Sequence, residues 1–451
     1  ARRARRRAGS GPRALARPLA RTPGAPIFAK MSHTPLTDEI ERWLLAEALH
    51  DADIVELFGA LCVRLHGLGI PLSRAALSWP TLHPLFQAEQ IYWRLGRGAE
   101  LFQYRHATEL TATFESSPFH HVLVNGLPSL RRRLEGPETL KDFPVLEELS
   151  EQGYTDYLLT ATSFRIADVG EYRGGASGIM ASWATARPGG FSDADLTALT
   201  RVQTTFAVAC HASIQKRVMS NLAAAYLGET GARRVLSGEV RRGDGDRIRA
   251  VLWYSDLRGS TRLSNALAPE AYLQLLRDYY DCTAQPVIDE GGEILEFIGD
   301  AVLAIFPIRG DTGGPEAARA ALRALEAARA RRRLCLSEKG APAGCTPDQL
   351  RFSIAVATGE MMFGNIGVPT RLTFSAIGAD VNRVARLEEL AKTLGRSALV
   401  TKEIAALEPG RWTPLGPHGL RDFEDPVEVC GLAEEQAAVA PGGGPEAAAA
   451  S

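Results

Sequence analysis

The sequence predicts two folded domains joined by a long helix: an α/β domain, then an α+β domain with a ferredoxin-like sheet. Helical and strand-like patterns alternate over residues 36–215, which indicates the first domain. Apolar residues then recur every three or four positions from about residue 192, as along one face of a helix. From residue 246 the patterns run strand, helix, hairpin, helix, strand, which is the order of a ferredoxin-like sheet with helices on one face.

Composition and charge indicate a globular protein with an acidic folded part. The chain has 451 residues, of which 45% are hydrophobic and 23% charged, and its length predicts two or three domains. Residues 1–30 hold eight arginines, one lysine and no acidic residue, so the rest of the chain carries 42 basic and 53 acidic residues. An acidic folded part argues against nucleic acid as the main partner.

The two ends of the chain are low in complexity. We expect residues 1–34 to be a disordered Arg/Pro-rich extension, although an Arg-rich stretch without acids also suits a transit peptide or an anionic surface. Residues 434–451 are expected to be a disordered tail. No transmembrane segment is predicted, and the six cysteines lack the spacing of disulfide or zinc sites, which favours a reduced, cytoplasmic protein.

The first domain is predicted at residues 35–215. Its start, DEIERWLLAEALHDADIVELFGALCVRLHGLG, reads as an amphipathic helix, and GYTDYLLTATSF and GGASGIMASWATA read as strands. Ser192 or Asp193 then caps a long helix, which with a Gly- and Arg-rich connector spans residues 192–245. Its apolar stripe either packs on its own domain or forms a dimer seam. The stripe consists of Leu199, Val202, Phe206, Cys210, Ile214, Val218 and Leu222.

The second domain is predicted at residues 246–433. IRAVLWYSD reads as a buried strand, PEAYLQLLRDYYDCTAQPVI as a helix and GEILEFIGDAVLAIFP as a hairpin. A second helix, PEAARAALRALEAARARRRL, precedes RFSIAVATGEMMFGNIG, which reads as a strand pair, and DVNRVARLEELAKTLG reads as a further helix.

Two aspartates of this domain are candidate metal ligands. Asp256 ends the first strand and Asp300 lies in the hairpin turn, so the predicted topology brings both to one edge of the sheet. Two adjacent carboxylates repel each other unless a proton or a cation lies between them, and an all-oxygen pair suits Mg²⁺ or Mn²⁺. Taken singly, each aspartate is equally well explained by a helix cap or a turn.

Three stretches, VLWYSDLRGSTRLS, GGEILEFIGDAVLAIF and FSAIGADVNRVARLEEL, together resemble the catalytic domain of class III nucleotidyl cyclases, the adenylate and guanylate cyclases. The resemblance implies attack of a ribose 3'-oxygen on the α-phosphorus of GTP or ATP, giving a 3',5'-cyclic nucleotide and pyrophosphate. It also implies a head-to-tail homodimer with each active site at the interface. No GxxxxGK[ST] pattern occurs, which disfavours a P-loop ATPase.

The resemblance also implies roles for individual residues. Asp256 and Asp300, helped by the backbone carbonyl of Leu257, would hold two Mg²⁺ or Mn²⁺ ions per active site. The turn from Arg258 to Thr261 would hold the triphosphate through its amides, at Gly259, Ser260 and Thr261. Asn382 would orient the ribose, Arg386 would stabilise the α-phosphate in the transition state, and Arg421 would bind the outer phosphates.

Base choice is expected to depend on Glu296 and Ser375, which occupy the two purine-facing positions of the family. A carboxylate accepts hydrogen bonds from the ring N–H and amino group of guanine, whereas adenine presents a lone pair at that ring nitrogen. Ser375 suits either base, because a hydroxyl both donates and accepts. Glu296 therefore favours GTP, with ATP and cyclic AMP as the alternative.

Residues 35–215 weakly resemble GAF-type sensor domains, chiefly in GGFSDADLTALTRVQTTFAVAC, and an unknown small molecule or protein would be the stimulus. Three functions are open: a sensor-regulated cyclase, a catalytically silent nucleotide-binding module, and a sensor and dimerisation module that signals to a protein partner.

Overall fold

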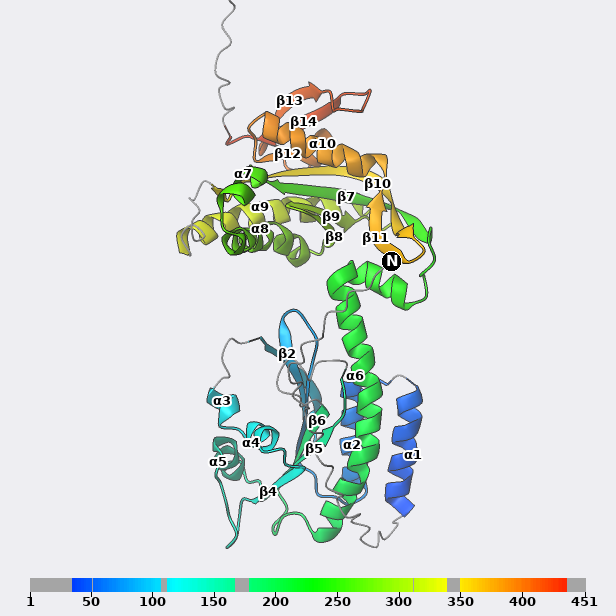
Figure 1. Cartoon of the computed structure of the whole chain (residues 1–451), viewed down its shortest axis with the longest axis vertical. Coiled ribbons are helices and arrows are strands. Elements are labelled where there is room, and N and C mark those ends of the chain that lie inside the picture. Colours follow the sequence, from blue (N-terminus) through cyan, green and yellow to red (C-terminus); the bar gives the residue numbers. More distant parts are fainter. Residues whose placement is uncertain are drawn as a thin grey trace, which may run out of the picture.

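The computed structural model describes residues 35–50, 52–106, 112–166, 178–310, 312–338 and 349–435. The chain forms two domains, and the kinked helix α6, which packs in the first domain, leads into the second (Figure 1). The predicted extension at residues 1–34 lies outside the described residues, as does the predicted tail from residue 436 onward. Within the described ranges, no helix is both long enough and apolar enough to cross a membrane.

The first domain is built on a six-stranded antiparallel sheet in the order β3-β2-β1-β6-β5-β4. The two strands predicted from the sequence are β5 and β6, and they pair in the sheet with Asp156 opposite Thr185. The strands are β1 (Arg74–Pro80), β2 (Phe86–Arg94), β3 (Gly98–Arg105), β4 (Ser129–Arg133), β5 (Asp156–Ser163) and β6 (Gly178–Thr185).

Helices cover both faces of this sheet. One core packs α1 (Pro35–Leu49), α2 (Ile54–Gly67) and α6 (Asp193–Leu236) against the central strands. A smaller core packs α4 (Pro118–Val124) and α5 (Pro144–Glu151) against β4 and β5, and α3 (Ala112–Glu115) precedes α4.

The single helix predicted at the start of this domain is wrong, because the segment forms the two helices α1 and α2. Asp53 is the N-cap of α2, because its carboxylate accepts hydrogen bonds from the backbone amides of Val55 and Glu56.

Helix α6 begins where the sequence predicted, and of the two candidate N-caps, Ser192 and Asp193, the structure has Ser192. The Ser192 side chain and Asp195 form a reciprocal capping box. Six of the seven stripe residues are buried, and Leu222 packs against the same core. The stripe therefore packs on its own domain, and its alternative interpretation as a dimer seam is wrong.

The predicted connector is partly helical, because α6 continues to Leu236. Gly228, with φ 73° and ψ 164°, kinks the helix; this left-handed φ favours glycine. Just beyond the kink, Thr230 donates from its amide and its hydroxyl to the Glu293 carboxylate of β8, each at 2.7 Å. The end of α6 is thereby fixed to the second domain.

The second domain has an eight-stranded sheet in which β13-β14-β12-β10-β7-β9-β8 form a path and β11 pairs with β10. Four of the strands lie side by side in the order β10-β7-β9-β8. Along the chain, α8 connects β7 to β8 and α9 connects β9 to β10, which confirms the predicted ferredoxin-like arrangement. The strands are β7 (Gly245–Leu257), β8 (Glu293–Ile298), β9 (Ala301–Pro307), β10 (Phe352–Val368), β11 (Arg371–Ile377), β12 (Ala398–Thr401), β13 (Trp412–His418) and β14 (Val427–Leu432).

Two predictions for this domain are wrong. The segment expected to form a strand pair is the single 17-residue strand β10, whose hairpin partner is β11. Helices also cover both faces of the sheet: α8 (Pro269–Asp289) and α9 (Gly314–Glu338) on one, α10 (Ala379–Thr393) on the other (Figure 1). The cause is visible in β7, where Ala250, Val251, Leu252 and Trp253 are all fully buried, so both faces need cover.

Candidate active site

The structure brings Asp256 and Asp300 together. Asp256 is the penultimate residue of β7, and it pairs with Ala301, the residue that follows Asp300, at the start of β9. The amide of Leu257 faces the carbonyl of Asp300 at 3.4 Å. Because β7 and the hairpin turn are neighbours in the sheet, both carboxylates lie at one edge, as the sequence predicts.

The Asp256 carboxylate has an unusual environment. Burial and the adjacent Asp300 carboxylate raise its pKa to about 7, although a hydrogen bond from Lys392 acts in the opposite direction. Its Oδ1 atom is buried and has no hydrogen-bond partner among the residues that the structure describes. A buried oxygen without a donor and a second carboxylate beside it fit a divalent cation.

The Asp256 and Asp300 side chains would supply a cation with two carboxylates. Across the described ranges, no group of three or more His, Cys, Asp or Glu side chains is placed to hold a metal. Any further ligands would therefore come from backbone carbonyls, water or substrate, as is usual for Mg²⁺. The carbonyl of Leu257 stays a predicted ligand.

Three side chains beside this pair were missed by the sequence reasoning. Lys392 of α10 contacts Asp256 Oδ2 and lies 3.1 Å from Glu388 Oε2, and Ser353 donates a hydrogen bond to Glu388. The spacing of Glu388 and Lys392 by four residues on a helix was the available signal. It could not reveal that they face Asp256.

The turn after β7 holds the predicted triphosphate-binding residues. Gly259 has a left-handed φ of 72° and precedes the short helix α7 (Ser260–Ala266). The amide of Arg258 donates to the carbonyl of Arg351 at 2.7 Å, so this part of the predicted phosphate contact is wrong. The amides of Ser260 and Thr261 belong to the first turn of α7, where no intrahelical acceptor exists.

Asn382, Arg386 and Arg421 lie away from the aspartates, around one exposed face of α10. Arg386 donates to Glu389 at 2.7 Å, and Arg421 lies 3.8 Å from the same carboxylate. Both arginines are also 3.5 Å from Asp422. The structure therefore brings Arg386 and Arg421 together and holds them with two carboxylates that the sequence reasoning did not single out.

The two groups of predicted site residues are separated within one chain. Lys392 contacts Asp256, whereas Asn382 lies ten residues earlier on the same helix, which is about 15 Å along the helix axis. Asn382 and Arg386 are one turn apart and share a face that is rotated by roughly 90° from Lys392. One chain thus presents the carboxylates and this α10 face as two separate groups of residues.

The two predicted purine-facing residues are in direct contact. The Ser375 hydroxyl of β11 donates to Glu296 Oε2 of β8 at 2.9 Å, although the two residues are 79 positions apart in the sequence. Ser375 is buried and Glu296 is partly exposed. The hydrogen bond fixes the carboxylate and leaves its second oxygen for another donor.

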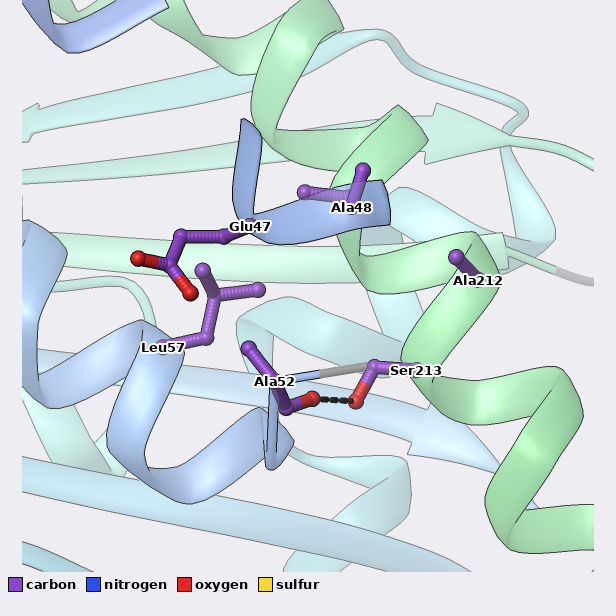
Figure 2. A pocket seen from close by; sticks show the side chains of 7 residues that line it. Glu47, Ala48, Ala52, Leu57, Ala212 and Ser213 are labelled. Carbon is purple, nitrogen blue, oxygen red and sulfur yellow. Dashed lines mark hydrogen bonds between the residues drawn. The ribbon is translucent and has the colours of Figure 1, made fainter. Parts of the chain in front are cut away.

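A shallow pocket in the first domain lies between α1, α2 and α6 and is lined largely by alanines (Figure 2). The Ser213 hydroxyl in its wall already donates to the Ala52 carbonyl at 2.8 Å. This pocket has no interior space for a bound molecule, so it does not identify a stimulus.

Comparison with protein families bears on the second domain. Residues 247–408 match the family model of the adenylate and guanylate cyclase catalytic domain. Among curated proteins, an adenylate cyclase of Anabaena cylindrica is 28% identical over 156 residues, which are 35% of this chain and 30% of that protein. Adenylate cyclase 1 of Rhizobium meliloti is 29% identical over 167 residues, 36% of this chain and 24% of that protein. The chain thus spans about a third or less of these relatives.

Solved structures give matches over a similar share of the chain. The adenylyl cyclase CyaB from P. aeruginosa is 27% identical with a TM-score of 0.37, over 43% of this chain and 97% of that one. The guanylyl cyclase Cya2 is 27% identical with a TM-score of 0.36, over 42% of this chain and 93% of that one.

Proposed function

We propose that this chain, whose residues 247–408 form an adenylate and guanylate cyclase catalytic domain, is a sensor-regulated nucleotidyl cyclase. The reaction converts a purine nucleoside triphosphate into a 3',5'-cyclic nucleotide and pyrophosphate. The observation that carries the proposal is the Asp256 and Asp300 pair, in which a buried Asp256 oxygen has no donor.

Some residues of the site bind the metal ions and the substrate, and others stabilise the transition state. Asp256, Asp300 and the Leu257 carbonyl would hold two divalent cations, Mg²⁺ or Mn²⁺. Such cations would supply Lewis-acid chemistry, lowering the pKa of the 3'-hydroxyl and offsetting the charge of the leaving pyrophosphate. Asn382 orients the ribose, and the Arg386 guanidinium stabilises the charge that develops on the α-phosphate.

The phosphates beyond the α-position are held by two further groups. The amides at Gly259, Ser260 and Thr261 bind the triphosphate, and Arg421 binds its outer phosphates. The guanidinium of Arg421 is two-thirds exposed and so is accessible to a ligand.

The enzyme works as a homodimer, in which the carboxylates of one chain meet the α10 face of its partner. The rise of about 15 Å along α10 between Asn382 and Lys392, the residue that contacts Asp256, supports this arrangement. So do three exposed apolar residues, Val208, Met219 and Tyr226, spaced 11 and 7 apart along α6 and therefore on one side of it. We expect activity per mole to fall on dilution; constant activity in a protein shown to be monomeric contradicts the dimer.

GTP is the favoured substrate because Glu296 is fixed by Ser375 with one oxygen free. A guanine satisfies this oxygen through its ring N–H or amino group, whereas adenine leaves it facing a lone pair, a mismatch of about 1–3 kcal/mol. ATP is the second candidate, because the curated relatives include proteins named adenylate cyclase.

The first domain acts as a GAF-like sensor. Its helix α6 runs out of the sensor core and is fixed to β8, the strand that carries Glu296. A small molecule or protein that shifts α6 would therefore act on the base-binding strand.

The test is cyclic nucleotide production by the purified chain given ATP or GTP separately, each with Mg²⁺ and with Mn²⁺. We expect cyclic GMP from the wild type and no cyclic nucleotide from a folded Asp300→Asn variant. Asp289→Asn, a surface change on α8 whose partner is Arg331, is the matched control and should retain activity. Cyclic AMP alone would reverse the base assignment, and equal activity of Asp300→Asn and wild type would refute the catalytic proposal.

A further inference from the structure

A network of three side chains, Lys392, Glu388 and Ser353, lies beside the Asp256 carboxylate. The Lys392 ammonium contacts Asp256 Oδ2 and lies 3.1 Å from Glu388 Oε2. Glu388 accepts a hydrogen bond from the Ser353 hydroxyl, and Ser353 is the residue paired with Asp256 across β7 and β10. The pairing of β7 with β10 therefore holds Ser353 beside Asp256. The contacts from Ser353 to Glu388 and from Glu388 to Lys392 then fix the position of the ammonium.

We propose that Lys392 is the resident counter-ion of the Asp256 and Asp300 carboxylates and competes with divalent cations for Asp256. This inference rests on the metal site of the proposed function. It makes Lys392 a positioning residue that sets the affinity of the site for metal, a role outside the reacting groups.

Charge balance supports this role. Lys392 contacts both Asp256 and Glu388, and Asp300 lies beside Asp256, so the ammonium lies among like charges that are unfavourable at short distance without a cation. The Lys392 ammonium neutralises one of these charges while no divalent ion is bound.

The position of Glu388 explains how the lysine can leave Asp256. Glu388 is only 1% exposed and lies one helical turn before Lys392, so it is a second partner already in place. If the Lys392 ammonium leaves Asp256, it stays paired with Glu388. Neither Lys392 nor Glu388 is then left as a buried, unpaired charge. A simple structural ion pair would not need this second partner.

The experiment measures Mn²⁺ binding to the full chain without nucleotide, from the electron paramagnetic resonance signal of free Mn²⁺. We expect Lys392→Met to bind Mn²⁺ about tenfold more tightly than the wild type, because one charged hydrogen bond no longer competes. Asp256→Asn should lose the binding. Lys402→Met is the matched control: Lys402 is an exposed lysine 3.9 Å from Glu428, and its loss should change nothing.

A second variant protects the test against misfolding, because Lys392→Met leaves Glu388 buried without its base. The double variant Glu388→Gln, Lys392→Met removes that charge and should show the same tenfold gain. Mn²⁺ should also raise the midpoint temperature of thermal unfolding more in both variants than in the wild type.

The outcomes separate this inference from the proposed function. If wild type binds Mn²⁺ through Asp256 but both lysine variants bind equally or more weakly, the counter-ion role is wrong and the metal site stands. If neither the wild type nor the variants bind Mn²⁺ through Asp256, the metal site itself is refuted, and this inference falls with it. Tighter binding by both variants, including binding seen only in them, supports the proposal.

Discussion

Removal of Arg217, on α6, is expected to destabilise the first domain strongly. Its guanidinium donates to both oxygens of Glu89 on β2, at 2.7 and 2.9 Å. Glu89 has no exposed side-chain surface, and its other side-chain donor is Gln103, at 2.7 Å. Arg217→Met therefore leaves a buried carboxylate with a single neutral donor.

The magnitude follows from the burial of the two partners. Removing one member of a buried ion pair costs about 3–5 kcal/mol, because the other charge stays desolvated. The Arg217 side chain is 26% exposed, so water can reach the gap and the lower end, about 3 kcal/mol, applies. Such a loss changes the folding equilibrium by about two orders of magnitude.

Hydrogen exchange of the α6 amides in the full chain measures this loss without assuming that the two domains unfold together. Arg132→Met is the matched control, because its partner Asp142 is one-third exposed and we expect a loss below about 1 kcal/mol. The double variant Glu89→Gln, Arg217→Met should recover much of the stability. The reasoning is refuted if Arg217→Met costs no more than Arg132→Met, or if the double variant is no more stable than Arg217→Met alone.

Two further changes test how helices are fixed in each domain. Gly359→Ala on β10 would place a methyl group 2.5 Å from Asp380 Cβ at the start of α10, so we expect chemical denaturation to show a loss of about 1–3 kcal/mol; an unchanged midpoint would contradict the close approach. Burial raises the pKa of Asp195, but hydrogen bonds from Ser192 and Arg187 outweigh it and leave the pKa below its usual value. A lowered pKa means that this stabilisation is present above about pH 4 and lost as the pH falls further. Asp195→Asn should therefore cost about 1 kcal/mol at pH 7, and this cost should shrink as the pH falls below about 4; a loss that does not change with pH would refute this account.

Much of the local structure could be predicted from the sequence. The N-cap Ser192, the hairpin around Asp300 and the ferredoxin-like order of strands and helices are all found in the structure. These features depend on residues that are close in the sequence, through caps, turn residues and hydrophobic period. The motif set also identified the cyclase catalytic domain, which the family match confirms.

Other features could not be predicted because they depend on which faces pack together. The apolar stripe of α6 was compatible with a dimer seam until the sheet of its own domain was seen to cover it. The segment that became β10 was predicted to be a strand pair, but it is one continuous strand, because β7 pairs with it from Phe352 to Gly364 and β11 pairs with its far end.

For the candidate site, the sequence by itself predicted the residues: two carboxylates at strand ends, an arginine and an asparagine one turn apart, and a glutamate at the position that the cyclase resemblance assigns to the purine. Only the tertiary structure decided that Ser375 binds Glu296, that Lys392 contacts Asp256, and that α10 separates Asn382 from Lys392. The physical reason is range. Residue type and spacing fix what a side chain can do, whereas its partner is set by the packing of helices on the sheet, which joins residues 79 and 136 positions apart.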